Sequence, residues 1–149
     1  MPLERGQALV EAALTLVLFF VFLLSIFEGG RLLQTQLTLT QAAREGARYA
    51  VLPLTQTSTL PDCTQIRGVV RTYLQASSVV LPDGDITVVR NQPVTPAPAT
   101  GPVICTKVSV RYTFNWAVLS LLGLPPVSLY GDSTMRNEIS PSLTSLPDC

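Results

Sequence analysis

The sequence predicts an α+β protein in which a long N-terminal helix, its first half transmembrane, packs on a small antiparallel sheet. Three observations predict this class. The residues from Ala12 to Phe27 carry no charge and are almost all apolar. Residues that favour helices then continue without proline as far as Leu52. Apolar and polar side chains alternate between Val103 and Phe114, which is typical of a strand with one buried face.

The first apolar run is long enough to cross a membrane once. The mean hydropathy of +0.37 is high for a soluble domain, and most of the excess lies in this run. With Ala8 to Val10 it amounts to roughly 20 residues, or about 30 Å of helix. Arg5 precedes the run and favours a cytoplasmic N-terminus with an extracytoplasmic remainder. A secretory signal core is shorter, about 7–15 residues, so an uncleaved signal anchor is the general alternative.

The helix is expected to continue beyond the membrane, from residue 29 to residue 52. Ala42, Gly46 and Ala50 recur there at four-residue spacing and make a strip of small side chains. Such a strip allows another backbone to approach closely. Its occupant is either the protein's own sheet or a neighbouring subunit, and the sequence leaves both open.

Residues 53–149 have ordinary composition and predict one small α+β head domain. Apolar residues at spacings of three and four predict a helix over Thr64–Val80, with Thr64 as its N-cap. Strands are predicted at Ile86–Arg90, Val103–Phe114 and Val127–Met135, the last two antiparallel. The proline-rich segment 91–102 is expected to be a loop within the domain.

A second apolar segment, Ala117–Leu124, is too short to span a membrane. It either covers the core of the head or forms a surface patch that lies on the membrane or on a neighbour. The first interpretation is favoured.

The chain has three cysteines, Cys63, Cys105 and Cys149. If this part of the chain lies outside the cytoplasm, one disulfide is expected and one thiol is left over. All three pairings are possible. Cys63 with Cys105 is favoured because each lies beside a predicted regular element, whereas Cys149 is a chain end.

The composition argues against several classes of function. Net charge is zero, Lys107 is the single lysine and the arginines are scattered, so a nucleic-acid partner is not expected. Histidine is absent, which removes the commonest general base and metal ligand at neutral pH. We therefore predict no catalytic residues, no metal site, no cofactor and no enzymatic activity.

The N-terminal residues resemble those of a known class of processed proteins. Gly6 followed by Gln-Ala-Leu-Val and then Glu11 reproduces the pattern of class III prepilin leaders. The stretches "ERGQALVEAAL" and "FEGGRLLQTQLTLTQAAREGARYAV", together with "VSLYGDSTMRNE" near the C-terminus, resemble the TadE-like family. This family comprises minor pilins or pseudopilins of tight-adherence (Flp-type) pilus systems.

The resemblance implies a domain organisation and a processing step. A prepilin peptidase would remove a leader of residues 1–6 by cleaving after Gly6, which leaves Gln7 as the new N-terminus. Residues 7–28 would be the transmembrane helix, 29–52 its extracytoplasmic continuation and 53–149 the head, in the lollipop outline of pilin-like proteins.

The resemblance also assigns a role to Glu11. In assembled pilin filaments, the N-terminal amine of one subunit pairs with the fifth-position glutamate of an adjacent subunit. Glu11 would then set the axial register between subunits, because an unpaired charge in an apolar filament core is expensive. The alternative is a carboxylate that stays at the level of the lipid headgroups.

The predicted function is that of a structural subunit in the assembly of a tight-adherence pilus or a related secretion apparatus, with roles in cell adhesion or secretion. Its expected partners are the membrane, the prepilin peptidase, other pilin or pseudopilin subunits and the pilus assembly platform. Its expected location is the cytoplasmic membrane, with incorporation in a surface pilus left open. The alternative function is a single-pass, membrane-anchored extracytoplasmic binding module that does not polymerise.

Overall fold

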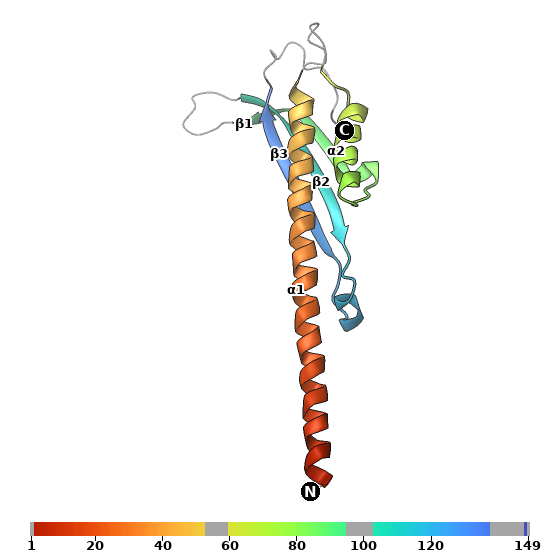
Figure 1. The fold of residues 1–149 in the computed structure, drawn as a ribbon. Helices are drawn as coiled ribbons and strands as arrows, with labels where there is room; N and C mark the ends of the chain where they lie inside the picture. The colour runs from red at the N-terminus through yellow and green to blue at the C-terminus, as the bar shows by residue number, and fades with distance from the viewer. Residues whose placement is uncertain (1, 53–59, 95–102, 138–147, 149) are drawn as a thin grey trace. The chain divides into compact units, whose positions relative to one another are not determined.

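The chain folds into two α-helices and three β-strands, seen in a computed structural model that describes residues 2–52, 60–94, 103–137 and 148 (Figure 1). In order, the elements are α1 (Pro2–Val51), α2 (Cys63–Ala76), η1 (Asp83–Asp85), β1 (Ile86–Val94), β2 (Val103–Phe114), η2 (Leu119–Leu122) and β3 (Val127–Arg136). The predicted α+β class, with a long apolar N-terminal helix and a small antiparallel sheet, is confirmed.

Helix α1 extends through the whole apolar run and beyond it. Leucine and alanine are its two commonest residue types, and both lose little side-chain freedom in a helix. It ends at Val51, one residue before Leu52, which precedes Pro53 in the sequence. The position before a proline is disfavoured in helices, so the sequence itself stops α1 there.

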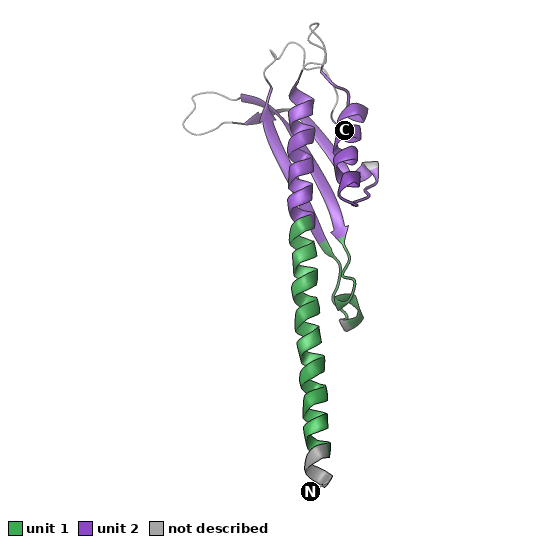
Figure 2. Cartoon of the chain, in the orientation of Figure 1, with its two compact units in different colours: residues 1–34, 114–127 green, residues 35–113, 128–149 purple. Residues whose placement is uncertain are grey.

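The chain divides into two compact units, which we describe separately (Figure 2). Unit 1 contains residues 1–34 and 114–127, and unit 2 contains residues 35–113 and 128–149. The apolar segment after β2 therefore groups with the first part of α1, a division that the sequence did not indicate.

The sheet of unit 2 has the order β1-β2-β3. Strands β1 and β2 are antiparallel, with Ile86 opposite Val110 and Val88 opposite Val108. The register shifts after Val89, and β1 continues through this irregularity to Val94, four residues past the predicted end. Strand β3 closes the sheet on the other side of β2.

The core of unit 2 lies between one face of this sheet and its two helical segments. Apolar side chains from all five elements are buried there: Leu39, Ala42, Ala43, Ala47, Ala50, Ile66, Val70, Leu74, Ile86, Val88, Val108, Val110 and Leu129. The opposite face of the sheet carries charged and polar groups, including an ion pair of 3.3 Å between Lys107 Nζ and Asp132 Oδ2. This one-sided burial produces the alternation seen in β2.

Helix α2 begins earlier and ends earlier than predicted. Asp62, and not Thr64, is the N-cap, because its carboxylate accepts a hydrogen bond from the backbone N–H of Gln65 at 2.8 Å. The Gln65 side chain accepts in turn from the backbone N–H of Asp62 at 3.0 Å, which completes a capping box. Helix α2 ends at Ala76, and the chain then turns through Ser78, which has a φ of 60°.

Strand β3 and α1 approach each other closely inside unit 2. A Cβ atom built at Gly131 would lie 2.5 Å from both the carbonyl carbon and the carbonyl oxygen of Leu39, and 2.8 Å from the amide nitrogen of Thr40. Only glycine leaves room for this approach, because the atoms that it meets belong to the backbone of α1. The Gln36 side chain also donates a 2.7 Å hydrogen bond to the carbonyl of Tyr130.

Candidate functional site

The predicted processing residues lie on the open surface of α1. Gly6 and Gln7 are helical and exposed, and a Cβ built at Gly6 would meet nothing within 4 Å. Among the residues whose side chains the structure describes, none therefore packs against Gly6. Cleavage at this bond stays a prediction.

Glu11 is exposed on the same helix, one turn and a half beyond Gly6. Its backbone carbonyl accepts a 2.9 Å hydrogen bond from the Thr15 hydroxyl. Its carboxylate has no hydrogen-bond or ion-pair partner among the residues that the structure describes. Pairing with the amine of another subunit involves a second chain and stays a prediction.

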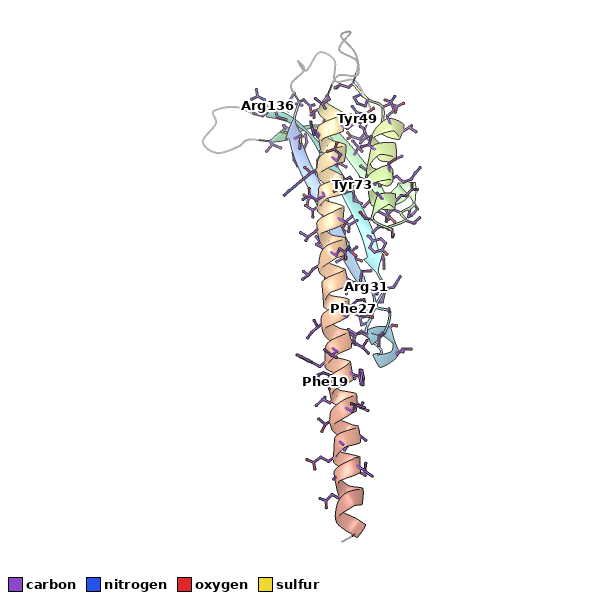
Figure 3. All side chains as sticks on the ribbon, in the orientation of Figure 1. Phe19, Phe27, Arg31, Tyr49, Tyr73 and Arg136 are labelled. Atoms are coloured by element: carbon purple, nitrogen blue, oxygen red, sulfur yellow. The ribbon has the colours of Figure 1, made fainter. Side chains whose placement is uncertain are left out.

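Beyond Glu11 and Thr15, the surface of the N-terminal half of α1 is apolar on every side of the helix. Consecutive residues Leu16 to Phe20 are each more than half exposed, and five consecutive positions cover all faces of a helix. Figure 3 shows side chains of this half of α1, Phe19 among them, projecting from the helix. Within the described residues, α1 is the one helix that is long and apolar enough to cross a membrane, and none of its most apolar window is buried by the rest of the chain. A helix that is hydrophobic all round requires lipid or other helices around it.

The strip of small residues faces inward in unit 2. Ala42 and Ala50 are buried, and a Cβ built at Gly46 would clash with Val70 Cγ2 of α2 and lie 3.4 Å from Val108 Cγ1 of β2. Of the two occupants left open by the sequence, the structure shows the protein's own α2 and sheet. This strip is therefore covered and not available to a neighbouring subunit.

The favoured disulfide pairing is wrong. Cys105 is a free thiol, 8% exposed, on the central strand β2. Cys63, the first residue of α2, is disulfide-bonded. The free state of Cys105 excludes both pairings that use it, and Cys149 lies outside the described residues. Proximity to a regular element in the sequence does not bring two Cα atoms within the few ångströms that a disulfide requires, which is why the prediction failed.

Two buried charged residues were not singled out in the sequence. Glu28 in unit 1 is 1% exposed and Arg90 in unit 2 is 6% exposed. Arg90 had a readable signal, because it follows Ile86 and Val88 at a spacing of two and so shares their inward face. Glu28 had none, because its burial depends on a segment that lies far away in the sequence.

Arg90 ties together three parts of unit 2. Its guanidinium donates to the carbonyl of Pro61 at 2.5 Å, and its backbone N–H donates to Asp148 Oδ1 at 2.6 Å. Burial lowers the pKa of Arg90, while the nearby carboxylates of Asp148 and Asp62 act in the opposite direction. These contacts hold the end of the chain against the start of α2.

A groove of about 640 Å³ lies between α1 and α2 in unit 2, but its lining offers little chemistry. Glu45 is the one acidic side chain among the described residues that line it: Glu45, Tyr49, Gln65, Gly68, Val69, Thr72, Tyr73 and Ala76. No group of three or more histidine, cysteine or acidic side chains gathers anywhere in the described part of the chain. The most distinctive surface is therefore the exposed apolar surface of the N-terminal half of α1.

Comparison with known proteins identifies the same segment. Residues 6–48 match the family model described as TadE-like protein. The matched region begins at Gly6, includes Glu11 and covers most of α1, so the resemblance seen in the sequence is confirmed over this part of the chain. It indicates involvement in a tight-adherence pilus system. No curated protein and no solved structure matches the chain.

Proposed function

We propose that the protein is a structural minor pilin or pseudopilin of a tight-adherence pilus system, cleaved by a prepilin peptidase after Gly6. The premise is the match of residues 6–48 to the TadE-like family. The role is non-catalytic, and the head serves to position the subunit among its partners.

The observation that carries this proposal is the exposed apolar surface of the N-terminal half of α1, which contains the exposed carboxylate of Glu11. The apolar half of α1 packs against little of its own chain, so it must be covered by lipid, by other helices or by each in turn. A carboxylate in lipid costs up to about 3 kcal/mol near the middle of a span and less near its end. Glu11 is tolerable in the membrane but gains from a cationic partner.

Cleavage after Gly6 would create that cation. The new amine at Gln7 would lie at the start of the helix, and the exposed Glu11 carboxylate of an adjacent subunit has the opposite charge. Bringing the two together in an apolar environment stabilises the subunits at one axial offset. A subunit that lacks Glu11 would still enter the membrane, but it would lose this register.

Processing is tested by replacing Gly6. In the full chain, expressed with its native peptidase, Gly6→Leu should retain residues 1–6, measured by intact mass and N-terminal sequencing. Gly30→Leu is the matched control, because Gly30 is also an exposed glycine of α1 at which an added Cβ would meet nothing within 4 Å. A Gln7 N-terminus in the Gly6→Leu protein would overturn the cleavage proposal.

Assembly is tested by replacing Glu11. Glu11→Val should be inserted and cleaved normally but should co-purify poorly with the other pilins of a surface-shear fraction. Glu45→Gln provides the control, since Glu45 is an exposed carboxylate of the same helix outside the apolar segment. Unchanged recovery of Glu11→Val would remove the register role. A native chain that is never cleaved and never recovered with other pilins would instead favour the anchored binding module.

A further inference from the structure

The loop of residues 114–127 belongs with the first part of α1 to unit 1 (Figure 2). It carries exposed apolar side chains. The Leu121 side chain is 85% exposed and that of Leu124 is 40% exposed. From the sequence, this segment was expected to cover the core of the head. The structure shows instead that these two side chains are exposed and that the segment belongs to unit 1. The question is what covers them.

The tip of the loop lies at the level of the apolar run of α1. Val118, Leu119 and Leu121 line a small pocket of about 140 Å³ together with two α1 residues, Val21 and Leu24. These two residues belong to the uncharged run that ends at Phe27. If the run is inside a bilayer, the tip of the loop is at the same depth.

The base of the loop has the chemistry of a membrane interface. The indole N–H of Trp116 donates to the Pro125 carbonyl at 2.9 Å, which joins the two sides of the loop. The Trp116 ring packs edge-on against Phe114 at 5.3 Å, and the Arg31 guanidinium lies 5.7 Å from the centre of the Phe114 ring. Arg31 is about 10 Å further along α1 than Leu24. Apolar side chains at one level, followed by tryptophan and arginine at the next, are the order found where a span leaves the bilayer.

Glu28 fixes the loop to the helix. Its Oε1 atom accepts a hydrogen bond from the backbone N–H of Val118, the residue that precedes η2 and has no side-chain cap of its own. The second oxygen, Oε2, is buried without a partner in the described structure. The Glu28 carboxylate is thus held under the loop by its contact with Val118, which keeps the tip beside Val21 and Leu24.

We propose that the loop 114–127 is a second membrane contact, whose tip enters the leaflet that surrounds Val21 and Leu24 and is covered by acyl chains. The proposal rests on α1 spanning a membrane and does not depend on assembly into a pilus. Lipid is the occupant because the exposed tip of the loop is continuous with the apolar surface of α1 at Val21 and Leu24. This apolar surface ends at the level of Trp116 and Arg31. Strand β2 leads into the loop and β3 leads out of it, so both are connected covalently to this contact.

The chain provides its own reporter of depth, because Trp116 is its single tryptophan. We would reconstitute the full chain at low density in vesicles of phosphatidylcholine and phosphatidylglycerol, with and without bromine on the acyl chains. Two further proteins carry Trp116→Phe and move the tryptophan, either to the tip with Leu121→Trp or to β3 with Tyr130→Trp. Both Leu121 and Tyr130 are more than half exposed, so the new rings need no room in a core.

The expected result is a graded response. The tip tryptophan should lose most of its emission in brominated lipid and resist aqueous iodide, and native Trp116 should respond to both quenchers. The Tyr130→Trp control should respond to iodide alone. A tip tryptophan that iodide quenches as strongly as the control would overturn the proposal. A tip tryptophan shielded from both quenchers would show that protein covers the patch, and this also overturns the lipid assignment.

Discussion

Gly131→Ala should destabilise unit 2 far more than the addition of one methyl group suggests. The added methyl group would sit 2.5–2.8 Å from backbone atoms of Leu39 and Thr40, where ordinary contacts of carbon atoms are about 3.5–4.0 Å. Strand β3 must therefore move away from α1 by roughly 1 Å, because neither backbone can rotate aside. Leu39 is fully buried beside this contact, so the shift opens a gap in the core.

The size of the effect follows from overpacking and lost contact. Overpacking of a well-packed core costs about 1–3 kcal/mol, and the upper half of this range applies because both sides of the contact are backbone. With a urea dependence of about 1–3 kcal/mol per molar, the middle of both ranges gives a fall in the unfolding midpoint of roughly 1 M. Gly46→Ala should also be destabilising, because the methyl group there would clash with Cγ2 of the fully buried, β-branched Val70, although the helix preference of alanine offsets about 1 kcal/mol of this cost.

The free, buried Cys105 thiol provides the assay. The full chain in detergent micelles is equilibrated in urea without reductant and pulsed with a maleimide, so that Cys105 is labelled where β2 has opened. Gly68→Ala is the matched control, since its methyl group meets nothing within 4 Å. The free energy of unfolding should stay unchanged or rise by up to about 1 kcal/mol, so the midpoint should not fall. A Cys105→Ser protein identifies background labelling. Equal midpoints for Gly131→Ala and Gly68→Ala would refute the argued contact between β3 and α1.

Four further predictions concern groups that the structure buries or joins. Alkylation of the unreduced, denatured chain should modify Cys105 and spare Cys63, and peptide mapping that finds Cys63 alkylated would contradict the disulfide. Asp148→Ala should lower stability by about 1–3 kcal/mol because it removes an acceptor and a countercharge from buried Arg90. Asp132→Ala should cost less than about 1 kcal/mol, since the side chains of Asp132 and Lys107 are 63% and 35% exposed. Urea midpoints that rank the two variants in reverse would contradict the argument from the burial of Arg90. Glu28→Ala should leave the Val118 N–H without its acceptor, so that a protease cleaves the loop 114–127 under limited proteolysis. Glu28→Gln keeps an acceptor, and its loop should resist the protease. Equal cleavage of both variants would show that Glu28 does not fix the loop.

The local signals in the sequence predicted the elements that depend on neighbours along the chain. The end of α1 followed from residues that favour helices and continue without proline as far as Leu52, and β2 followed from the alternation at Val103–Phe114. The start of α2 was missed although its signal was present, since Asp62 and Gln65 stand at the spacing of a capping box. That error came from choosing Thr64 as the cap and not from a tertiary effect.

The parts of the site that could be predicted are those that a single helix carries. Gly6, Gln7 and Glu11 are exposed on α1, and no other segment of the described chain packs on them. Their roles in processing and register stay predictions. The occupant of the Ala42, Gly46 and Ala50 strip could not be decided, because small residues permit a close approach without specifying which backbone makes it.

By itself, the sequence determined that an apolar helix with one carboxylate near its start precedes a small α+β head, since helix propensity, hydropathy and strand alternation are properties of adjacent residues. Only the tertiary structure decided which cysteine stays free, why Gly131 must be glycine, and that Glu28 and the loop 114–127 meet beside the apolar run. Each of these depends on distances between segments separated by tens of residues, and no local pattern encodes such distances.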